Sequence, residues 1–230
     1  YEMELLCAGE EFYAAMKRSA NGGGENSPML AGEDDFYELF MASIQAKKKG
    51  EVMNSIQDYY TLHDGSRLPV QGFGTYQVVG QDNVKILKTA IQCGYRFFDT
   101  ASLYETERAL GQAVRESGIP REEFVIETKL WISERGYENA RQALEASLAR
   151  LQMDYVDLYL IHWPRQSGAW NENWAEINAE TWRALEEMQA EGKIRSIGCS
   201  NFLPHHLIPL LRDCRVRPVV NQLELHPGHS

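Results

Sequence analysis

Short apolar runs alternate with longer amphipathic stretches through most of the chain, and this alternation constrains the fold more than any other feature. Each run has a length typical of a strand, whereas the stretches between them repeat apolar residues at helical spacing. Strands that alternate with helices form β-α-β units, and right-handed crossovers assemble such units into a parallel sheet. We expect six strands, at Gly72–Gln77, Arg96–Ala101, Phe124–Trp131, Tyr155–Trp163, Ser196–Phe202 and Pro218–Leu225.

A hairpin signal precedes the first of these strands. The segments Tyr60–Asp64 and Arg67–Val70 flank Gly65, and Asp followed by Gly is a strong turn signal between two short strands. We therefore expect a β-hairpin ahead of the repeating units.

Two architectures accommodate repeated β-α-β units. A doubly wound nucleotide-binding sheet would carry G-x-G-x-x-G at its first strand-to-helix turn, but the segment Gly72-Phe-Gly-Thr-Tyr-Gln77 lacks the third glycine. A (β/α)8 barrel instead collects polar residues at the C-terminal ends of several strands, because its sites are built there. The sequence follows the second pattern.

Polar side chains lie at or just after the C-terminal ends of the first five expected strands, and within the sixth. Each alone has a structural reading: a satisfied histidine, a lysine paired with an acid, an aspartate that caps a helix or a tyrosine on a surface loop. Their joint occurrence at one barrel mouth favours a functional site. In strand order they are Thr75 and Tyr76, Asp99 and Tyr104, Lys129, His162, Ser200 and Asn201, and Asn221 and Gln222.

These residue types permit carbonyl reduction. A tyrosine has an ordinary pKa of ~10 and becomes a useful acid when cations beside it stabilise the phenolate, a role open to Lys129 and His162. A lysine in an apolar strand needs a counter-ion, and Asp99 on the neighbouring strand supplies one. The result is a phenol with a lowered pKa that protonates a developing alkoxide. The amides of Asn201 and Gln222 suit a carboxamide such as that of nicotinamide.

Composition and charge exclude several classes of protein. Hydrophobic residues make up 43% and charged residues 24% of the 230 residues, as in globular proteins, and the net charge of −10 disfavours nucleic acid or an anionic membrane as the main partner. No apolar window of ~18 residues occurs, and the N-terminus is too acidic for a secretory signal. The scattered cysteines indicate a reduced compartment and no structural metal. We expect a soluble, cytoplasmic protein.

Six motifs resemble those of the aldo-keto reductases, in order and at family spacing over about residues 56–230. They are Gly72-Phe-Gly-Thr-Tyr76, Phe98-Asp99-Thr-Ala101 with Tyr104-x-x-Glu107, Thr128-Lys129-Leu-Trp131, Ile161-His162-Trp-Pro164, Gly198-Cys-Ser-Asn-Phe202 and Asn221-Gln222-x-Glu-x-His-Pro227.

The resemblance assigns roles to individual residues. It implies a catalytic tetrad of Asp99, Tyr104, Lys129 and His162, a small carbonyl substrate and NADPH as cofactor, with NADH as the alternative. Tyr76 and Trp131 are implied as walls of the substrate pocket. The nicotinamide-ribose side of the cofactor site is implied to be lined by Thr75, Tyr76, Asp99, Ser200, Asn201 and Gln222.

The family barrel has eight strands, whereas this chain shows six. We expect an α/β fold of the (β/α)8 TIM-barrel type with an N-terminal β-hairpin, truncated after the sixth strand and spanning residues 53–230. In the family, later segments supply the aromatic ring stacked on nicotinamide and the basic residues for the 2′-phosphate. Six strands do not close a barrel, so the first and sixth strands are expected to be edges that favour self-association, whereas the complete fold is expected to be monomeric.

Residues 1–52 do not resemble the family. Their pattern is helical-looking, in two pieces around the turn-rich stretch 21–28, and we expect an appended segment joined through that stretch and the run Lys47-Lys48-Lys49.

Three functions remain open at this point. The first is a carbonyl reductase that takes hydride from nicotinamide and a proton from Tyr104. The second is a truncated or non-catalytic relative that acts as a binding or regulatory subunit, and the third is a fragment with a structural or partner-dependent role.

Overall fold

The computed structural model describes residues 3–6, 55–56, 58–166 and 173–224. Strands and helices alternate from β4 onward, as the apolar periodicity predicts. The strands are β1 (Met3–Leu6), β2 (Tyr59–Thr61), β3 (Arg67–Pro69), β4 (Gly72–Gly74), β5 (Phe97–Asp99), β6 (Val125–Leu130), β7 (Val156–Ile161), β8 (Ile194–Ser200) and β9 (Asn221–Glu224). The helices are α3 (Asn83–Gln92), α4 (Glu107–Glu116), α5 (Tyr137–Leu151), α6 (Trp174–Ala190) and α7 (Pro204–Asp213), with short 3-10 turns η1 (Ser102–Tyr104), η2 (Arg121–Glu123) and η3 (Ile132–Glu134).

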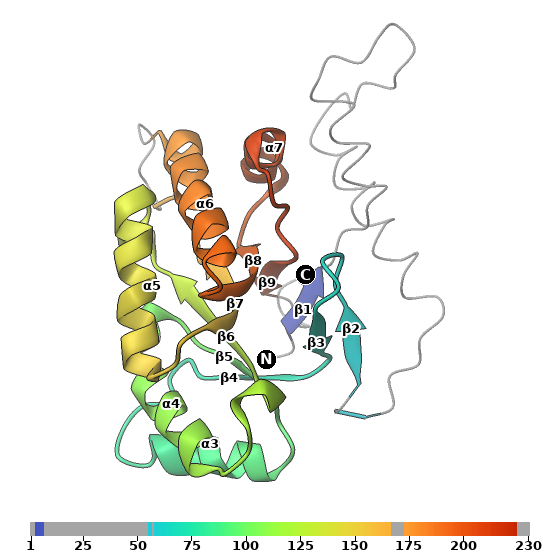
Figure 1. Ribbon diagram of the computed structural model, residues 1–230, viewed down its shortest axis with the longest axis vertical. Helices are drawn as coiled ribbons and strands as arrows, with labels where there is room; N and C mark the ends of the chain where they lie inside the picture. The colour runs from blue at the N-terminus through green and yellow to red at the C-terminus, as the bar shows by residue number, and fades with distance from the viewer. Residues whose placement is uncertain (1–2, 7–54, 57, 167–172, 225–230) are drawn as a thin grey trace, which may run out of the picture.

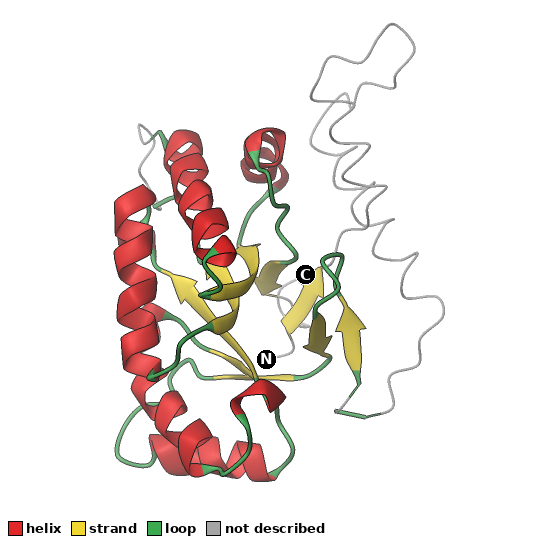
Figure 2. Cartoon of the chain, in the orientation of Figure 1, coloured by secondary structure: helices red, strands yellow, loops and turns green. Residues whose placement is uncertain are grey.

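The main sheet has seven strands in the order β1-β9-β8-β7-β6-β5-β4. The strands from β4 to β9 are parallel and neighbour one another in chain order, and each joins the next through a helix. Figure 1 shows the sheet curling, with the helices wrapped around its outer face. Figure 2 shows the strands enclosed on that side by helices and facing the hairpin β2-β3 on the other. This is a curled, six-stranded parallel half-barrel, the truncated barrel that the sequence predicts.

The hairpin prediction is also confirmed, since β2 and β3 pair antiparallel around Gly65, which adopts the left-handed φ of +85° that the turn requires. The hairpin is tied to the base of the barrel. The Ser196 hydroxyl on β8 donates to Asp64 at 2.6 Å, and the His63 ring lies 3.2 Å from the Pro218 carbonyl oxygen.

One expectation about the ends of the sheet needs correction. The sixth parallel strand, β9, is not an edge, because β1 pairs with it antiparallel from Met3 opposite Glu224 to Leu6 opposite Asn221. The first parallel strand, β4, is an edge among the described strands, as expected. Residues 3–6 therefore form a strand although residues 1–52 look helical in sequence. An exposed row of backbone donors and acceptors recruits any segment able to extend beside it, whatever that segment's own propensity. The remainder of that appended segment lies outside the described residues.

Alternate side chains of the strands face two different cores. The outward set packs under the helices, and includes Phe98, Ile126, Tyr159 and Ile197. The inward set begins with an apolar layer beneath the hairpin, which contains Leu62, Leu68, Phe97, Leu158, Leu160, Val219 and Val220. Continuing along the same inward rows toward the C-terminal ends, the side chains become polar, so the residues that the sequence singles out form a layer above an apolar floor.

The contact between α4 and α5 is close enough to require a glycine. A methyl group added at Gly111 would lie 2.0 Å from the carbonyl oxygen of Leu151, and backbone atoms do not yield as side chains do.

Gly111→Ala should therefore destabilise the protein by about 1–3 kcal/mol, although alanine is the better helix former by about 1 kcal/mol. Gly74→Ala is the matched control, because no atom lies within 4 Å of a methyl group there. Urea unfolding of both variants measures the difference. A Gly111→Ala protein as stable as the control would contradict the close packing of α4 on α5.

None of the helices in the described parts of the chain is both long enough and apolar enough to cross a lipid bilayer.

Candidate active site

Lys129 is the centre of the polar layer. It lies on the inward row of β6, its side chain is 1% exposed, and its ammonium is ion-paired with the Asp99 carboxylate on β5. The same Nζ lies 3.0 Å from Glu127 Oε1, and it donates to the Thr100 carbonyl oxygen at 3.3 Å. Burial lowers the pKa of the Lys129 ammonium, while the two carboxylates act in the opposite direction by stabilising its charged form. The expected pair of Lys129 and Asp99 is present.

Tyr104 reaches the layer from the loop that follows β5. It ends the short turn η1, and Glu105 after it adopts a left-handed φ of +59°, which turns the chain into α4. Hydrogen bonds of the Thr106 hydroxyl anchor the loop. They join it to the Thr75 hydroxyl at 2.8 Å and to the Thr100 hydroxyl at 2.9 Å. These contacts hold Tyr104 over the strand ends.

The phenol and the imidazole of the predicted tetrad meet directly. The Tyr104 hydroxyl lies 3.2 Å from His162 Nε2, and the Lys129 ammonium lies 5.5 Å from the centre of the Tyr104 ring. His162 follows β7, and its carbonyl oxygen accepts a hydrogen bond from Asn201 Nδ2 at 3.0 Å. The four residues that the sequence predicts as catalytic therefore converge at one rim.

The imidazole is neutral at physiological pH. Burial, and then the nearby charge of Lys129, lowers the pKa of His162 to about 3. Its Nδ1 is buried and has no hydrogen-bond partner among the described residues. His162 thus acts as a neutral hydrogen-bonding group beside the phenol rather than as the cation considered from the sequence.

The phenol is shifted in the direction opposite to the expected one. Burial first, and then the charges of Glu127 and Tyr76, raises the pKa of Tyr104 to about 12. The expectation of a lowered value assumed that Lys129 and His162 would both act as cations toward the phenol. In the structure His162 is neutral and Lys129 is already ion-paired with Asp99 beside Glu127, so the cost of burying a phenolate outweighs their effect.

Aromatic side chains line this rim in a row. Neighbouring ring centres are 5.0 Å apart between Tyr76 and Tyr104, 5.6 Å between Tyr104 and His162, and 5.1 Å between His162 and Trp131. Tyr76 is 63% exposed, whereas Trp131 is half-buried. The Glu134 carboxylate holds the row in place, since it accepts from the Ser102 hydroxyl and the Trp131 backbone, each at 2.7 Å. Tyr76 thus contacts the phenol ring and Trp131 contacts the imidazole, and their role as walls of a substrate pocket stays a prediction.

Three of the six residues expected on the cofactor side, Ser200, Asn201 and Gln222, lie at the C-terminal end of β8 and on β9. The Ser200 hydroxyl donates to the Gln222 carbonyl oxygen at 3.1 Å, and Asn201 Nδ2 lies 3.1 Å from the Ser200 hydroxyl. Asn201 adopts a left-handed φ of +61°, a conformation that asparagine tolerates better than most residues. Gln222 points into the polar layer, and Asn221 instead bridges to the backbone of Phe202. Thr75 is fully buried on Thr106, which gives it a role in holding the loop.

Glu127 was missed from the sequence. It is fully buried two residues before Lys129 on the same inward row, and it accepts from Gln222 Nε2 at 3.0 Å. The signal was available, because an acid two positions from a lysine in an apolar strand must share its face.

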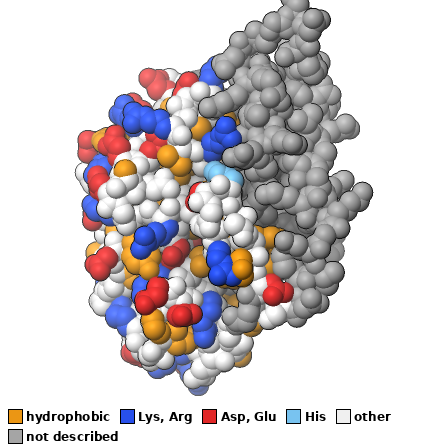
Figure 3. All heavy atoms as spheres, turned by 45° about the vertical axis from the view of Figure 1, so that its right-hand side comes forward, with side chains coloured by type: hydrophobic (Ala, Val, Ile, Leu, Met, Phe, Trp, Pro, Cys, Tyr) orange, Lys and Arg blue, Asp and Glu red, His pale blue; other side chains and the backbone are white. Residues whose placement is uncertain are grey.

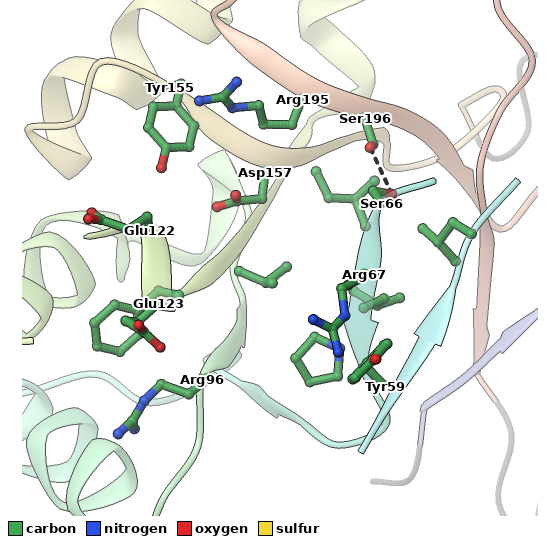
Figure 4. A pocket seen from close by; sticks show the side chains of 16 residues that line it. Tyr59, Ser66, Arg67, Arg96, Glu122, Glu123, Tyr155, Asp157, Arg195 and Ser196 are labelled. Carbon is green, nitrogen blue, oxygen red and sulfur yellow. Dashed lines mark hydrogen bonds between the residues drawn. The ribbon is translucent and has the colours of Figure 1, made fainter. Parts of the chain in front are cut away.

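A cavity of about 710 Å³ lies elsewhere, at the N-terminal ends of β6, β7 and β8 beneath the hairpin. Figure 4 shows Arg67 and Tyr59 from the hairpin facing Asp157 and Arg195 across it. None of the predicted site residues lines it. Acidic, basic and apolar side chains intermix on the face shown in Figure 3, so no single charge dominates there.

Comparison with known proteins supports the motifs independently. A model described as the Aldo/keto reductase family matches residues 71–229. A 9,11-endoperoxide prostaglandin H2 reductase of Trypanosoma cruzi is 45% identical over 76% of this chain and 59% of its own length, and a glyoxal reductase of Bacillus subtilis is 45% identical over 75% and 60%. A solved aldo-keto reductase of Bombyx mori, in complex with NADP, superposes with a TM-score of 0.67 at 32% identity, over 75% of this chain and 59% of that one. The chain thus spans about 60% of the length of these relatives.

Proposed function

The chain belongs to the aldo/keto reductase family, and from that premise we propose that its polar rim serves the NADPH-dependent reduction of a small aldehyde or ketone to the alcohol, with Tyr104 as proton donor. The observation that carries the proposal is the contact of the Tyr104 hydroxyl with His162 Nε2, made directly above the buried pair of Lys129 and Asp99. A general acid must be held by groups that fix its geometry. Here Tyr104 is held by His162, which follows β7, above Lys129 on β6 and Asp99 on β5.

The rim suits a nicotinamide cofactor. Asn201 uses its Nδ2 within the protein, and its Oδ1 has no hydrogen-bond partner among the described residues, so that oxygen is available to accept from a carboxamide NH2. The exposed ring of Tyr76, which packs against Tyr104, offers an apolar surface at the same rim. When bound, the cofactor would supply the hydride. NADPH is the proposed cofactor because the Bombyx mori relative was solved with NADP, with NADH as the alternative.

The chain's own residues then act on the carbonyl oxygen. The Tyr104 hydroxyl donates a hydrogen bond to that oxygen and transfers its proton as negative charge develops there. His162 Nε2 orients the oxygen or the phenol, and its neutral state lets it do so without competing for the charge of Lys129. Lys129 compensates the phenolate left behind, and Asp99 keeps the ammonium in place. Tyr76 and Trp131 exclude water from the reacting oxygen.

The substrate class follows from the relatives. The Bacillus subtilis relative is named a glyoxal reductase, so we propose a small reactive aldehyde such as glyoxal as substrate. The test is to mix the chain with NADPH and glyoxal and to follow loss of the nicotinamide absorbance together with formation of the alcohol. Cofactor binding without turnover would favour a binding or regulatory subunit. Neither binding nor turnover would favour a structural role for the chain.

A further inference from the structure

Glu127 occupies the least accessible position of the polar layer. It lies opposite Asp99 in the register of β5 and β6, and its neighbour on β7 is the buried Leu158. Its carboxylate is fully enclosed, yet the reduction as proposed gives it no role. A carboxylate in such a place is costly unless its charge is matched.

The contacts show that the charges do not balance. Lys129 lies between Asp99 and Glu127, so two buried carboxylates share one ammonium. Gln222 Nε2 also reaches both, at 3.0 Å from Glu127 Oε1 and 3.4 Å from Asp99 Oδ2. If both acids were ionised, the layer would hold one uncompensated negative charge away from water.

The hydrogen bonds indicate which acid carries the extra proton. Both oxygens of Asp99 accept a bond, Oδ1 from Lys129 and Oδ2 from Gln222. In Glu127 only Oε1 accepts, whereas Oε2 is buried and has no hydrogen-bond partner among the described residues. A buried oxygen without a donor carries a proton more cheaply than a negative charge. Burial likewise raises the pKa of Glu127 to about 8, against the opposing effect of the bond from Gln222.

We propose that Glu127 is a positioning residue for the reduction, which is protonated at neutral pH and whose protonation leaves the charge of Lys129 free to stabilise the phenolate of Tyr104. When Glu127 ionises, it takes a share of the Lys129 charge and opposes the phenolate. The groups that face it are Asp99 on β5, Lys129 on β6, Tyr104 after β5 and His162 after β7, with the neutral Gln222 on β9.

This role rests on the proposed function. Its tests do not depend on that function, because they use the ligand-free chain. The first test is the pH dependence of unfolding. Because the native state binds a proton that the unfolded state releases near the ordinary pKa of ~4.3, stability conferred by neutral Glu127 is complete below that pH and is lost as the pH rises toward about 8. The folding equilibrium constant should lose up to about tenfold per pH unit in that window from this one group.

Glu127→Gln removes that titration while keeping a group of the same shape. Its stability relative to the unchanged chain should rise between pH ~4.3 and about 8. The control is Glu122→Gln, an exposed acid five residues earlier, which should leave the slope unchanged. Parallel pH profiles for the unchanged chain and Glu127→Gln would overturn the proposal.

The second test reads the phenol itself. At the highest pH at which both proteins stay folded, 13C NMR of labelled tyrosine, assigned with Tyr104→Phe, should show about tenfold more Tyr104 phenolate in Glu127→Gln than in the unchanged chain. Equal phenolate in the two proteins would refute the coupling. Should the variant fail to fold, the carboxyl carbon of Glu127 in the unchanged chain decides the matter, since ionisation complete by pH 6 contradicts a proton held at neutral pH. The pH dependence of unfolding, the Tyr104 phenolate and the Glu127 carboxyl signal can all be measured in a chain without reductase activity. Absence of that activity would therefore contradict the proposed function alone.

Discussion

Tyr104→Phe should lower the rate of carbonyl reduction by about 10²–10⁴-fold, the usual contribution of a general acid, while cofactor affinity stays within a few-fold. The substitution removes the hydroxyl that meets His162 Nε2 and retains the ring that packs between Tyr76 and His162. Steady-state kinetics with glyoxal and NADPH measure the effect on kcat, and nicotinamide fluorescence measures binding.

The matched control is Tyr60→Phe on the exposed hairpin strand β2, which should leave the rate unchanged. A Tyr104→Phe enzyme that retains more than about a tenth of the rate would assign proton donation to another group or to water.

Lys129→Met should cost about 3–5 kcal/mol of stability and abolish turnover. Removing one partner of a buried ion pair leaves the other charge uncompensated, and here the Asp99 carboxylate would be left without its cation beside the protonated Glu127. Chemical unfolding at neutral pH measures the loss, and the kinetic assay on the folded fraction measures turnover.

Lys88→Met provides the comparison, because Lys88 pairs with Glu116 at 3.0 Å on the surface, where such a pair contributes about 1 kcal/mol or less. Adding Glu127→Gln to Lys129→Met should change the stability little at neutral pH, because Glu127 is already protonated there, and should not restore turnover. A Lys129→Met protein as stable as Lys88→Met would show that the layer is hydrated rather than dry.

The arrangement of the parallel strands was predictable because strand periodicity and chain order determine it. Polar residues such as Lys129 and His162 interrupt apolar runs near their ends, and parallel strands bring those ends to one edge. The tetrad positions came from the motifs, and the structure brings all four together. Five of the six parallel strands are shorter than the expected runs, as β5 is at Phe97–Asp99, whereas β8 keeps the expected length and begins two residues earlier, at Ile194.

The electrostatics of the site were not predictable in the same way. The shift of Tyr104 depends on how deeply the ring is buried and on how the charge of Lys129 is divided, and neither follows from spacing along the chain. The pairing of residues 3–6 with β9 could not be predicted from the periodicity either. It joins two segments near opposite ends of the sequence, and what brings them together is the open edge of the sheet at β9.

That pairing has a consequence for the order of folding. Each parallel strand pairs with the one before it, so the loop to be closed is one helix and its connections, whereas joining Leu6 to Asn221 closes almost the whole chain. The entropic cost of closing a loop grows only with the logarithm of its length, so the extra cost here is roughly 2 kcal/mol. That cost falls on a strand of four residues that, among the described strands, pairs on one side only. β1 should therefore dock last during folding and open first. Amide hydrogen exchange would show this as faster exchange in β1 than in β6. While β1 is undocked, the edge of β9 is open to other strands, both during synthesis and during turnover.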